Sequence, residues 1–244
     1  MNTGKPYSPT GFELVAEGAV LITAAVFVFF IGGNTKIMSI VVGALIVLRF
    51  VFLYRKGDVV YFLVGFVVGG GNDVMSMWRG VYYYTPPTIL PVPIPVWMLF
   101  FWGLGFLFLR RLVRWRFFQE EDSRREKLFD KPLVADVAVA VVYRAIVYSW
   151  AAVAYLPGAL YASILVIRVL VFPPSREERR LMISILLLGP LYEALLIGGG
   201  LYVYQNGAVF GMPIWLVVYW VFMIRVMKQV FDWLETKIAA KKLP

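Results

Sequence analysis

One pattern of residues occurs twice in this chain, about 120 residues apart, and it constrains the fold more than any other feature. The matching pairs are Leu14-Val15-Ala16-Glu17 with Leu133-Val134-Ala135-Asp136, Arg49 with Arg168, Asp73 with Glu193, Gly80-x-Tyr82-x-Tyr84 with Gly200-x-Tyr202-x-Tyr204, and Pro93-Ile94 with Pro213-Ile214. The offset is 119 for the first pairs and 120 for the later ones, so one inserted residue aligns them all. Chance does not keep register over such a length, and the sequence therefore predicts an internal repeat.

The composition places this repeat in a membrane. Hydrophobic residues make up 61% of the chain, aromatic residues 17%, and the mean hydropathy is +0.76. A chain of 244 residues holds about eight spans of roughly 20 residues each. The apolar segments predict helices near residues 12–32, 37–54, 58–80, 96–113, 133–155, 158–173, 181–200 and 214–235. We therefore expect an all-α polytopic membrane protein with eight transmembrane helices.

The charge distribution predicts the orientation. With these helices, Lys5, Arg55, Lys56, the run from Arg110 to Lys131, the basic residues after Arg176 and the C-terminal lysines all fall on one side, and the opposite loops contain only Lys36. Basic residues collect on the cytoplasmic side of membrane proteins. Both termini are therefore expected in the cytoplasm, and the net charge of +9 points to anionic membrane lipids as partners rather than to nucleic acid.

Each repeat contains four predicted helices, and an even number returns the chain to its starting side. We therefore expect two parallel repeats, related by a pseudo-twofold axis along the membrane normal. Repeat one covers residues 1–113 and repeat two covers residues 133–244. A charged cytoplasmic linker, residues 114–132, joins them.

The absence of two residue types limits the chemistry. The chain contains no His and no Cys. This excludes haem, iron–sulfur clusters and zinc held by those ligands, and also catalysis by Cys or His. We expect no metal site and no cofactor, and acid–base chemistry would fall to Asp, Glu, Tyr, Lys or Arg.

Two charged pairs are expected near the cytoplasmic end of the helices. Glu17 and Arg49 lie at similar predicted depth, and Asp136 and Arg168 repeat the arrangement. Pairing lowers the cost of burying each charge. We interpret both pairs as structural ion pairs inside their repeats rather than as catalytic groups.

Asp73 and Glu193 are the candidate catalytic residues. Both lie at or beyond the predicted midplane, and each follows a sequence that disrupts helices, Gly69-Gly70-Gly71 or Gly189-Pro190. Broken helices at membrane depth are tolerated where they are buried in protein or line a cavity. A carboxyl group in such a cavity is a potential proton donor, and ionisable residues inside a membrane are functional by default. The alternative is a structural pair with Arg79 or Arg144.

Aromatic and basic residues surround the two acids in the sequence. The candidate substrate-binding residues are Trp78, Arg79, Tyr82, Tyr84, Tyr202, Tyr204 and Arg144, with Trp97, Trp102, Trp215 and Trp220 on neighbouring segments. Electron-rich rings attract cations, including cationic intermediates. The alternative reading is a belt of interfacial anchors. Gly65-x-x-x-Gly69 is a small-xxx-small pattern that predicts close helix packing.

The sequence also resembles a known group of membrane proteins. Asp73-x6-Gly80-x-Tyr82-x-Tyr84-x-Pro86, followed by Pro93-Ile94-Pro95 and an aromatic-rich helix, is similar to the carotenoid-modifying proteins, which include the lycopene-cyclase domain and the carotenoid hydratases. The resemblance covers residues 58–105 and, more faintly, 181–222. It implies that Asp73 and Glu193 protonate a polyene or stabilise a carbocation. The lycopene-cyclase domain has paired glutamates after its proline motif, whereas here Val96-Trp97 and Ile214-Trp215 follow.

Three function classes follow from these patterns. The first is an intramembrane enzyme that protonates a hydrophobic isoprenoid or polyene and so drives cyclisation, isomerisation or hydration. The second is a non-catalytic subunit of a membrane assembly, with another membrane protein as partner. The third is a small proton-coupled transporter, since repeats and buried acids are common in transporters.

Overall fold

The computed structural model describes residues 7–88, 93–119, 127–153 and 155–240. Within them the chain is helical apart from one small sheet. The helices are α1 (Gly11–Ile31), α2 (Thr35–Leu53), α3 (Asp58–Val64), the π-helical turn η1 (Gly65–Gly69), α4 (Gly70–Trp78), α5 (Val96–Arg114), the 3-10 turn η2 (Arg116–Phe118), α6 (Lys131–Trp150), α7 (Leu156–Val171), α8 (Arg176–Gly198) and α9 (Ile214–Ala239), and the strands are β1 (Tyr82–Tyr84) and β2 (Tyr202–Tyr204). The segment α3–η1–α4 is one continuous rod.

Local signals set several helix starts. Thr10 and Ser175 each form a capping box, at α1 and at α8, in which the hydroxyl accepts from the N3 backbone and the N3 glutamate accepts from the cap. Asn34 and Asp130 accept hydrogen bonds at the starts of α2 and α6. Pro95 and Pro213 occupy the N-cap positions of α5 and α9.

The helices have the length and composition of membrane spans. Seven of them in the described residues are long and apolar enough to cross a bilayer, and α7 is a shorter apolar helix. Large apolar side chains such as Phe30, Phe52 and Leu170 are exposed on the outer surface, where lipid would cover them. The protein is an integral multi-pass membrane protein, and the predicted all-α class is confirmed.

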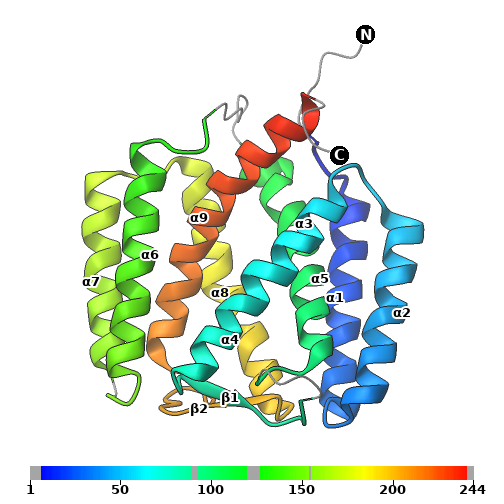
Figure 1. The fold of residues 1–244 in the computed structure, drawn as a ribbon. Helices are drawn as coiled ribbons and strands as arrows, with labels where there is room; N and C mark the ends of the chain where they lie inside the picture. Colours follow the sequence, from blue (N-terminus) through cyan, green and yellow to red (C-terminus); the bar gives the residue numbers. More distant parts are fainter. Residues whose placement is uncertain (1–6, 89–92, 120–126, 154, 241–244) are drawn as a thin grey trace.

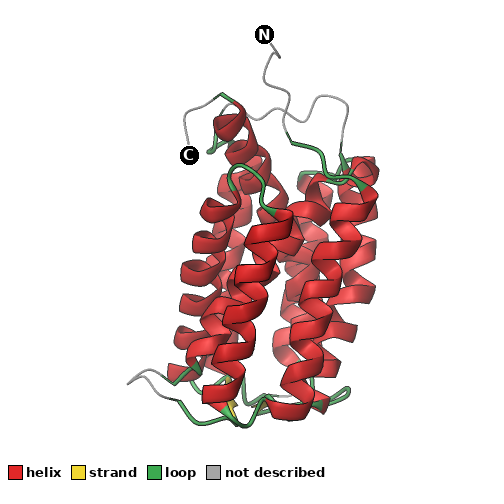
Figure 2. Ribbon diagram, turned by 90° about the vertical axis from the view of Figure 1, so that its right-hand side faces the viewer, coloured by secondary structure: helices red, strands yellow, loops and turns green. Residues whose placement is uncertain are grey.

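The helices run side by side as one bundle (Figures 1 and 2). Two of them are central: 67% of the α5 span and 50% of the α9 span are buried, against 17% for α1 and α2. The start of α1 and the end of α9 lie at the same end of the bundle, and the small sheet closes the opposite end (Figure 1). We call these the terminal end and the sheet end.

The two strands close the sheet end in a symmetric register. They pair antiparallel, with Tyr82 opposite Tyr204, Tyr83 opposite Val203 and Tyr84 opposite Tyr202. Each strand follows a helix that ends with a glycine at positive φ, Gly80 at 67° or Gly200 at 72°. In both turns the residue after the glycine donates its N–H to the carbonyl five residues earlier, which is a Schellman motif. Two equivalent turns therefore deliver the two strands to one another.

The two helix disruptions predicted from the sequence, one before Asp73 and one before Glu193, have different outcomes in the structure. The rod before Asp73 changes to π-helical geometry over Gly65–Gly69, and π turns are common at functional sites. The predicted break at Gly189-Pro190 is wrong, because α8 is continuous through Pro190. A proline removes only one backbone donor, and the neighbouring turns hold this helix together.

Two predicted segments fall partly outside the described residues. The charged linker 114–132 includes residues 120–126, and the outer loop from Val81 to Pro95 includes residues 89–92. The described part of that outer loop is ordered by β1 and by a hydrogen bond of 2.6 Å from the Thr35 hydroxyl to the Pro87 carbonyl. The part of the linker next to α5 forms η2, which packs on α8.

Candidate ligand-binding site

Asp73 lies in the first turn of α4, and its buried carboxyl is turned toward the centre of the bundle. The Tyr82 hydroxyl donates to Oδ1 at 2.6 Å, and the Tyr84 hydroxyl and the Trp102 indole N–H donate to Oδ2 at 2.6 Å each. The side chains therefore come from β1 and from α5. A carboxylate has about four acceptor positions, so three of those of Asp73 are taken.

Glu193 on α8 has a matching but smaller set of donors. The Tyr202 hydroxyl donates to Oε2, and the Trp220 indole N–H donates to Oε1 at 3.0 Å. Glu193 thus keeps about two acceptor positions that no described residue uses. Burial and then the adjacent carboxyl charge raise the pKa of Tyr82 and of Tyr202 well above the usual value, so both hydroxyls stay protonated donors.

The two carboxyl sites adjoin one another. The rings of Trp102 and Trp220 stack with centroids 6.5 Å apart, and the rings of Tyr82 and Tyr202 are 5.7 Å apart. Both carboxyls line one cavity of about 90 Å³. Asp73 and Glu193 therefore face the same space rather than two separate ones.

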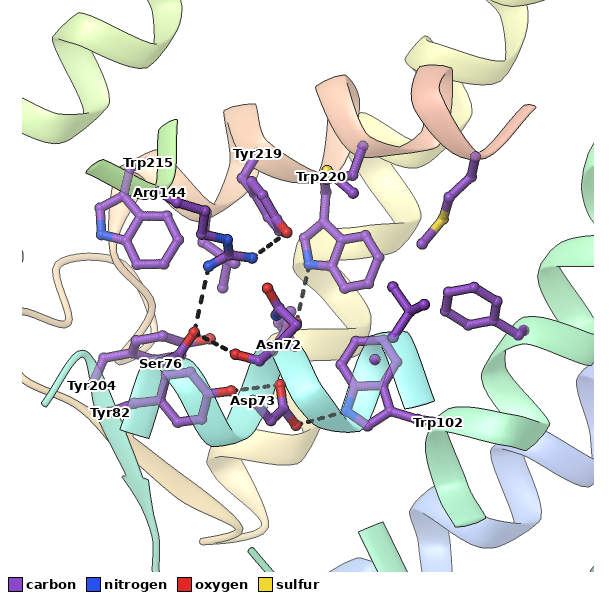
Figure 3. A pocket seen from close by; sticks show the side chains of 17 residues that line it. Asn72, Asp73, Ser76, Tyr82, Trp102, Arg144, Tyr204, Trp215, Tyr219 and Trp220 are labelled. Carbon is purple, nitrogen blue, oxygen red and sulfur yellow. Dashed lines mark hydrogen bonds between the residues drawn. The ribbon is translucent and has the colours of Figure 1, made fainter. Parts of the chain in front are cut away.

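We call this space the polar cavity (Figure 3). Besides the carboxyls, its polar lining residues are Asn72, Ser76, Tyr82, Arg144, Tyr204 and Tyr219. The rest of the lining is apolar or aromatic, and it includes Val68, which is 57% exposed on the outer face of the bundle. A polar chamber thus adjoins a lipid-facing rim.

A second space, the apolar cavity, lies on the other side of Glu193. Its volume is about 280 Å³, and α1, α5 and α8 form most of its wall. Glu193, Trp102 and Trp220 line both cavities. Ile22, Leu188 and Leu191, which border the apolar cavity, are 62%, 47% and 60% exposed, so it reaches the surface that lipid covers. Glu193 is its one acidic lining residue among those described.

Arg144 is the basic residue of the polar cavity. It reaches in from α6, and its guanidinium donates to the Ser76 hydroxyl at 3.4 Å and to the Tyr219 hydroxyl. The predicted alternative, an ion pair between Asp73 or Glu193 and Arg79 or Arg144, does not occur among the described residues. Arg144 lies instead over the ring of Tyr219 at 4.6 Å.

The candidate substrate-binding residues divide into two groups. Tyr82, Tyr204 and Arg144 line the polar cavity, and Tyr84 and Tyr202 hold the carboxyls by hydrogen bonds. Trp78 is 64% exposed, and Arg79 lies 5.8 Å from the ring of Tyr148. These two do not line either cavity.

Asn72, Ser76 and Tyr219 were not singled out from the sequence. Helical spacing carries a signal for two of them: Ser76 is three residues after Asp73, and Tyr219 is four residues after Trp215. The close approach of helices that brings them together has no such signal. The Gly65-x-x-x-Gly69 pattern does pack as predicted, since a Cβ on Gly69 would lie 2.5 Å from the Trp102 ring.

A second charged layer lies toward the terminal end. Arg49 Nε and Glu17 Oε1 are 2.9 Å apart, and Arg168 Nε and Asp136 Oδ1 are 2.6 Å apart. Around Arg49 this layer extends to Asp58, which pairs with Arg49 at 2.6 Å and also with Arg110 and Arg111. All these side chains are buried. The described residues contain no cluster of three or more acidic side chains that could hold a metal ion.

These features define a polytopic α-helical membrane protein with a buried carboxyl site, and comparison with solved structures identifies its fold. It is similar to the crystal structure of a mycobacterial Insig homolog, MvINS from Mycobacterium vanbaalenii, with a TM-score of 0.56 and 21% sequence identity. The match covers 78% of this chain and 97% of that one. A cross-linked trimer of a variant of MvINS matches with a TM-score of 0.55 at the same identity and coverage.

The family comparison covers the second half of the chain. Residues 136–243 match a family model described as a protein of unknown function, DUF2878. No curated protein matches. The solved structures thus identify the fold, and function has to be argued from the site.

Proposed function

We propose that this protein binds a hydrophobic molecule that enters the apolar cavity from the bilayer, with Glu193 contacting its polar or reactive group. The single observation that carries this proposal is the apolar cavity that ends on one carboxyl. Its volume of about 280 Å³ is near the lower end of the range for small-molecule sites, about 300–1,000 Å³. An apolar wall with few, placed polar groups is the usual form of such sites.

The two acids differ in how much of each is available to a ligand. Asp73 is held by three donors and Glu193 by two. Glu193 also lines both cavities, whereas Asp73 lines only the polar one. Glu193 is therefore the residue that would contact the bound molecule, and Asp73 would fix the tyrosines and Trp102 around it.

Proton transfer to that molecule is the second candidate function. A protonated Glu193 would donate to a double bond, and the Trp102 and Trp220 faces would stabilise the cation that forms. This is the isoprenoid or polyene enzyme that the sequence predicts, and the substrate class rests on the resemblance to carotenoid-modifying proteins. A non-catalytic subunit remains the alternative, and its ligand would be bound but unchanged.

We also infer that the chain is a duplication with parallel repeats. The symmetric strand register, the two matching Schellman turns and the matching Tyr and Trp donors support a pseudo-twofold axis through the Tyr83–Val203 pair. The start of α1 and the end of α9 lie at the same end of the bundle, which supports both termini on one side of the membrane. The excess of basic residues at that end supports the cytoplasm as that side.

The test is to fill the apolar cavity. Gly105 lines it, and a Cβ there meets no atom within 4 Å, so Gly105→Phe places a ring in the cavity without a backbone clash. Gly43→Phe on α2 is the matched control, because its Cβ is equally free and it does not line the cavity. Wild type and both variants are purified in mild detergent, and their bound small molecules are measured by mass spectrometry.

We expect one apolar species in about equimolar amount in wild type and Gly43→Phe, and a loss of about tenfold or more in Gly105→Phe. The same bulk phospholipids in all three proteins would contradict the proposal. Glu193→Gln then separates the candidates. An enzyme accumulates a molecule that differs from the wild-type one by a water or by isomerisation, whereas a binding subunit carries the same molecule.

A further inference from the structure

The two cavities occupy equivalent positions in the two repeats but differ in chemistry. By the repeat offset, Asn72, Ser76 and Arg144 of the polar cavity correspond to Tyr192, Leu196 and Ala25. Trp102 and Trp220 have the same role at an offset of 118, and with that offset Tyr219 corresponds to Phe101. The partners Tyr192, Leu196 and Phe101 line the apolar cavity. Among these equivalent positions, the amide of Asn72, the aliphatic hydroxyl of Ser76 and the guanidinium of Arg144 belong to the polar cavity alone, and the one polar group on the other side is the Tyr192 hydroxyl.

Of these polar groups, Arg144 costs the most free energy to place inside a membrane. It lies on a membrane-spanning helix, about two turns before Trp150, and arginine within a span is expensive unless it has a partner or a function. No carboxylate of the described residues forms an ion pair with it, and its hydrogen-bond partners among them are two neutral hydroxyls. A guanidinium has five N–H donors, so it retains donors for a ligand.

The surrounding groups favour an oxyanion. Asn72 lines the same cavity, and its side chain makes no hydrogen bond to the described residues. The acceptors of Asp73 are directed at Tyr82, Tyr84 and Trp102. Besides the open acceptor positions of Glu193, the cavity therefore offers the donors of Arg144 and Asn72 to an incoming group. A guanidinium matches a carboxylate in geometry and charge.

We propose that the polar cavity binds the carboxylate of an apolar, long-chain acid, with Arg144 as the anchor, at a site separate from the apolar cavity. The chain would leave past Val68, Phe106 and Met223, which form the apolar part of the wall. The depth of Arg144 places the carboxylate near one membrane interface, where the head groups of amphiphiles lie. A small polar chamber with an apolar exit suits such a molecule.

The test compares two ligands with the same chain, a long-chain fatty acid and its methyl ester. Binding is measured to the full-length protein in detergent, for wild type, Arg144→Gln and Arg79→Gln. Arg79 is the matched control, because it lies at a similar distance from the Tyr148 ring, 5.8 Å against 6.0 Å for Arg144, and does not line the cavity. Loss of a charge-assisted contact corresponds to about tenfold or more in affinity.

We expect wild type and Arg79→Gln to bind the acid about tenfold or more tightly than the ester. Arg144→Gln should bind both equally, at the affinity of the ester, which also shows that the variant is folded. Equal binding of acid and ester by wild type would overturn the proposal, and so would an acid preference that survives in Arg144→Gln. Gly105→Phe should leave the acid preference unchanged, so the two cavities are tested separately.

Discussion

At the scale of single residues, the site depends on uncharged donors rather than on counter-ions. Asp73 accepts hydrogen bonds from a tyrosine of β1 and a tryptophan of α5. Glu193 accepts them from a tyrosine of β2 and a tryptophan of α9. Toward the terminal end the opposite rule holds, since arginines hold Glu17, Asp58 and Asp136. The central carboxyls thus have neutral hydrogen-bond donors as partners, whereas the acids toward the terminal end have charged ones.

The first prediction concerns the extra donor of Asp73. Tyr84→Phe removes one hydrogen bond to a buried carboxyl, and leaving such a group underpaired costs about 1–3 kcal/mol. Tyr83→Phe is the control, because Tyr83 is 58% exposed and points away from the carboxyl. Thermal unfolding in detergent should show a lower midpoint for Tyr84→Phe alone. Equal midpoints for the two variants would mean that the bond contributes nothing.

The second prediction concerns Asp58, which binds three arginines. Asp58→Asn removes the charge that they share, and breaking a buried ion pair costs about 3–5 kcal/mol. We expect severe loss of folded protein on size-exclusion chromatography. Glu177→Gln, at a partly exposed position on α8, should behave as wild type. Normal yield of Asp58→Asn would show that the arginines do not need it.

At the scale of elements, the rod α3–η1–α4 is positioned by its glycines. A Cβ on Gly65 would lie 2.6 Å from the Trp102 carbonyl oxygen, and one on Gly69 would lie 2.5 Å from the Trp102 ring. Because Trp102 also donates to Asp73, a change in how this rod packs against Trp102 would change the geometry of the site. The π-helical turn lies at this contact.

The third prediction follows from that contact. Gly69→Ala should destabilise the protein by about 1–3 kcal/mol, since extra volume in a packed contact forces neighbours apart. Gly71→Ala, two residues along, meets nothing within 4 Å and should be neutral or stabilising by up to about 1 kcal/mol from helix propensity. Denaturant or thermal unfolding of the pair measures the difference. A Gly69→Ala protein as stable as Gly71→Ala would contradict the close packing.

Elements also show how far the sequence could predict the structure. Helix positions followed from runs of apolar residues and from turns, and they agree with the structure within a few residues at most ends. Asp58 was missed because it stands at a helix start, where an acid normally caps in water. A short sequence distance from Asp73 suggests that Trp78 and Arg79 lie near the acid, but at the last residue and the C-cap of α4 both side chains are exposed. To predict where a side chain points, one must know how its helix is rotated relative to the neighbouring helices, and the hydropathy pattern does not give that rotation.

At the scale of the whole molecule, the chain has no cysteine, so single cysteines can report its orientation without background. Lys36 lies in the first turn of α2, at the sheet end, and Lys56 lies near the terminal end, and both are exposed. In intact cells, a membrane-impermeant maleimide should label Lys36→Cys, and should label Lys56→Cys only after permeabilisation. This fourth prediction follows from the excess of basic residues at the terminal end. The reverse pattern would invert the proposed topology.

The register of the small sheet has a consequence for how the two cavities communicate. Tyr84, which binds Asp73, stands opposite Tyr202, which binds Glu193. A shift of β1 would move the hydroxyls that hold Asp73, and because β1 pairs with β2 it would also disturb the strand whose Tyr202 holds Glu193. The small sheet would therefore couple a ligand in one cavity to a ligand in the other, and the affinity of each would depend on whether the other is present.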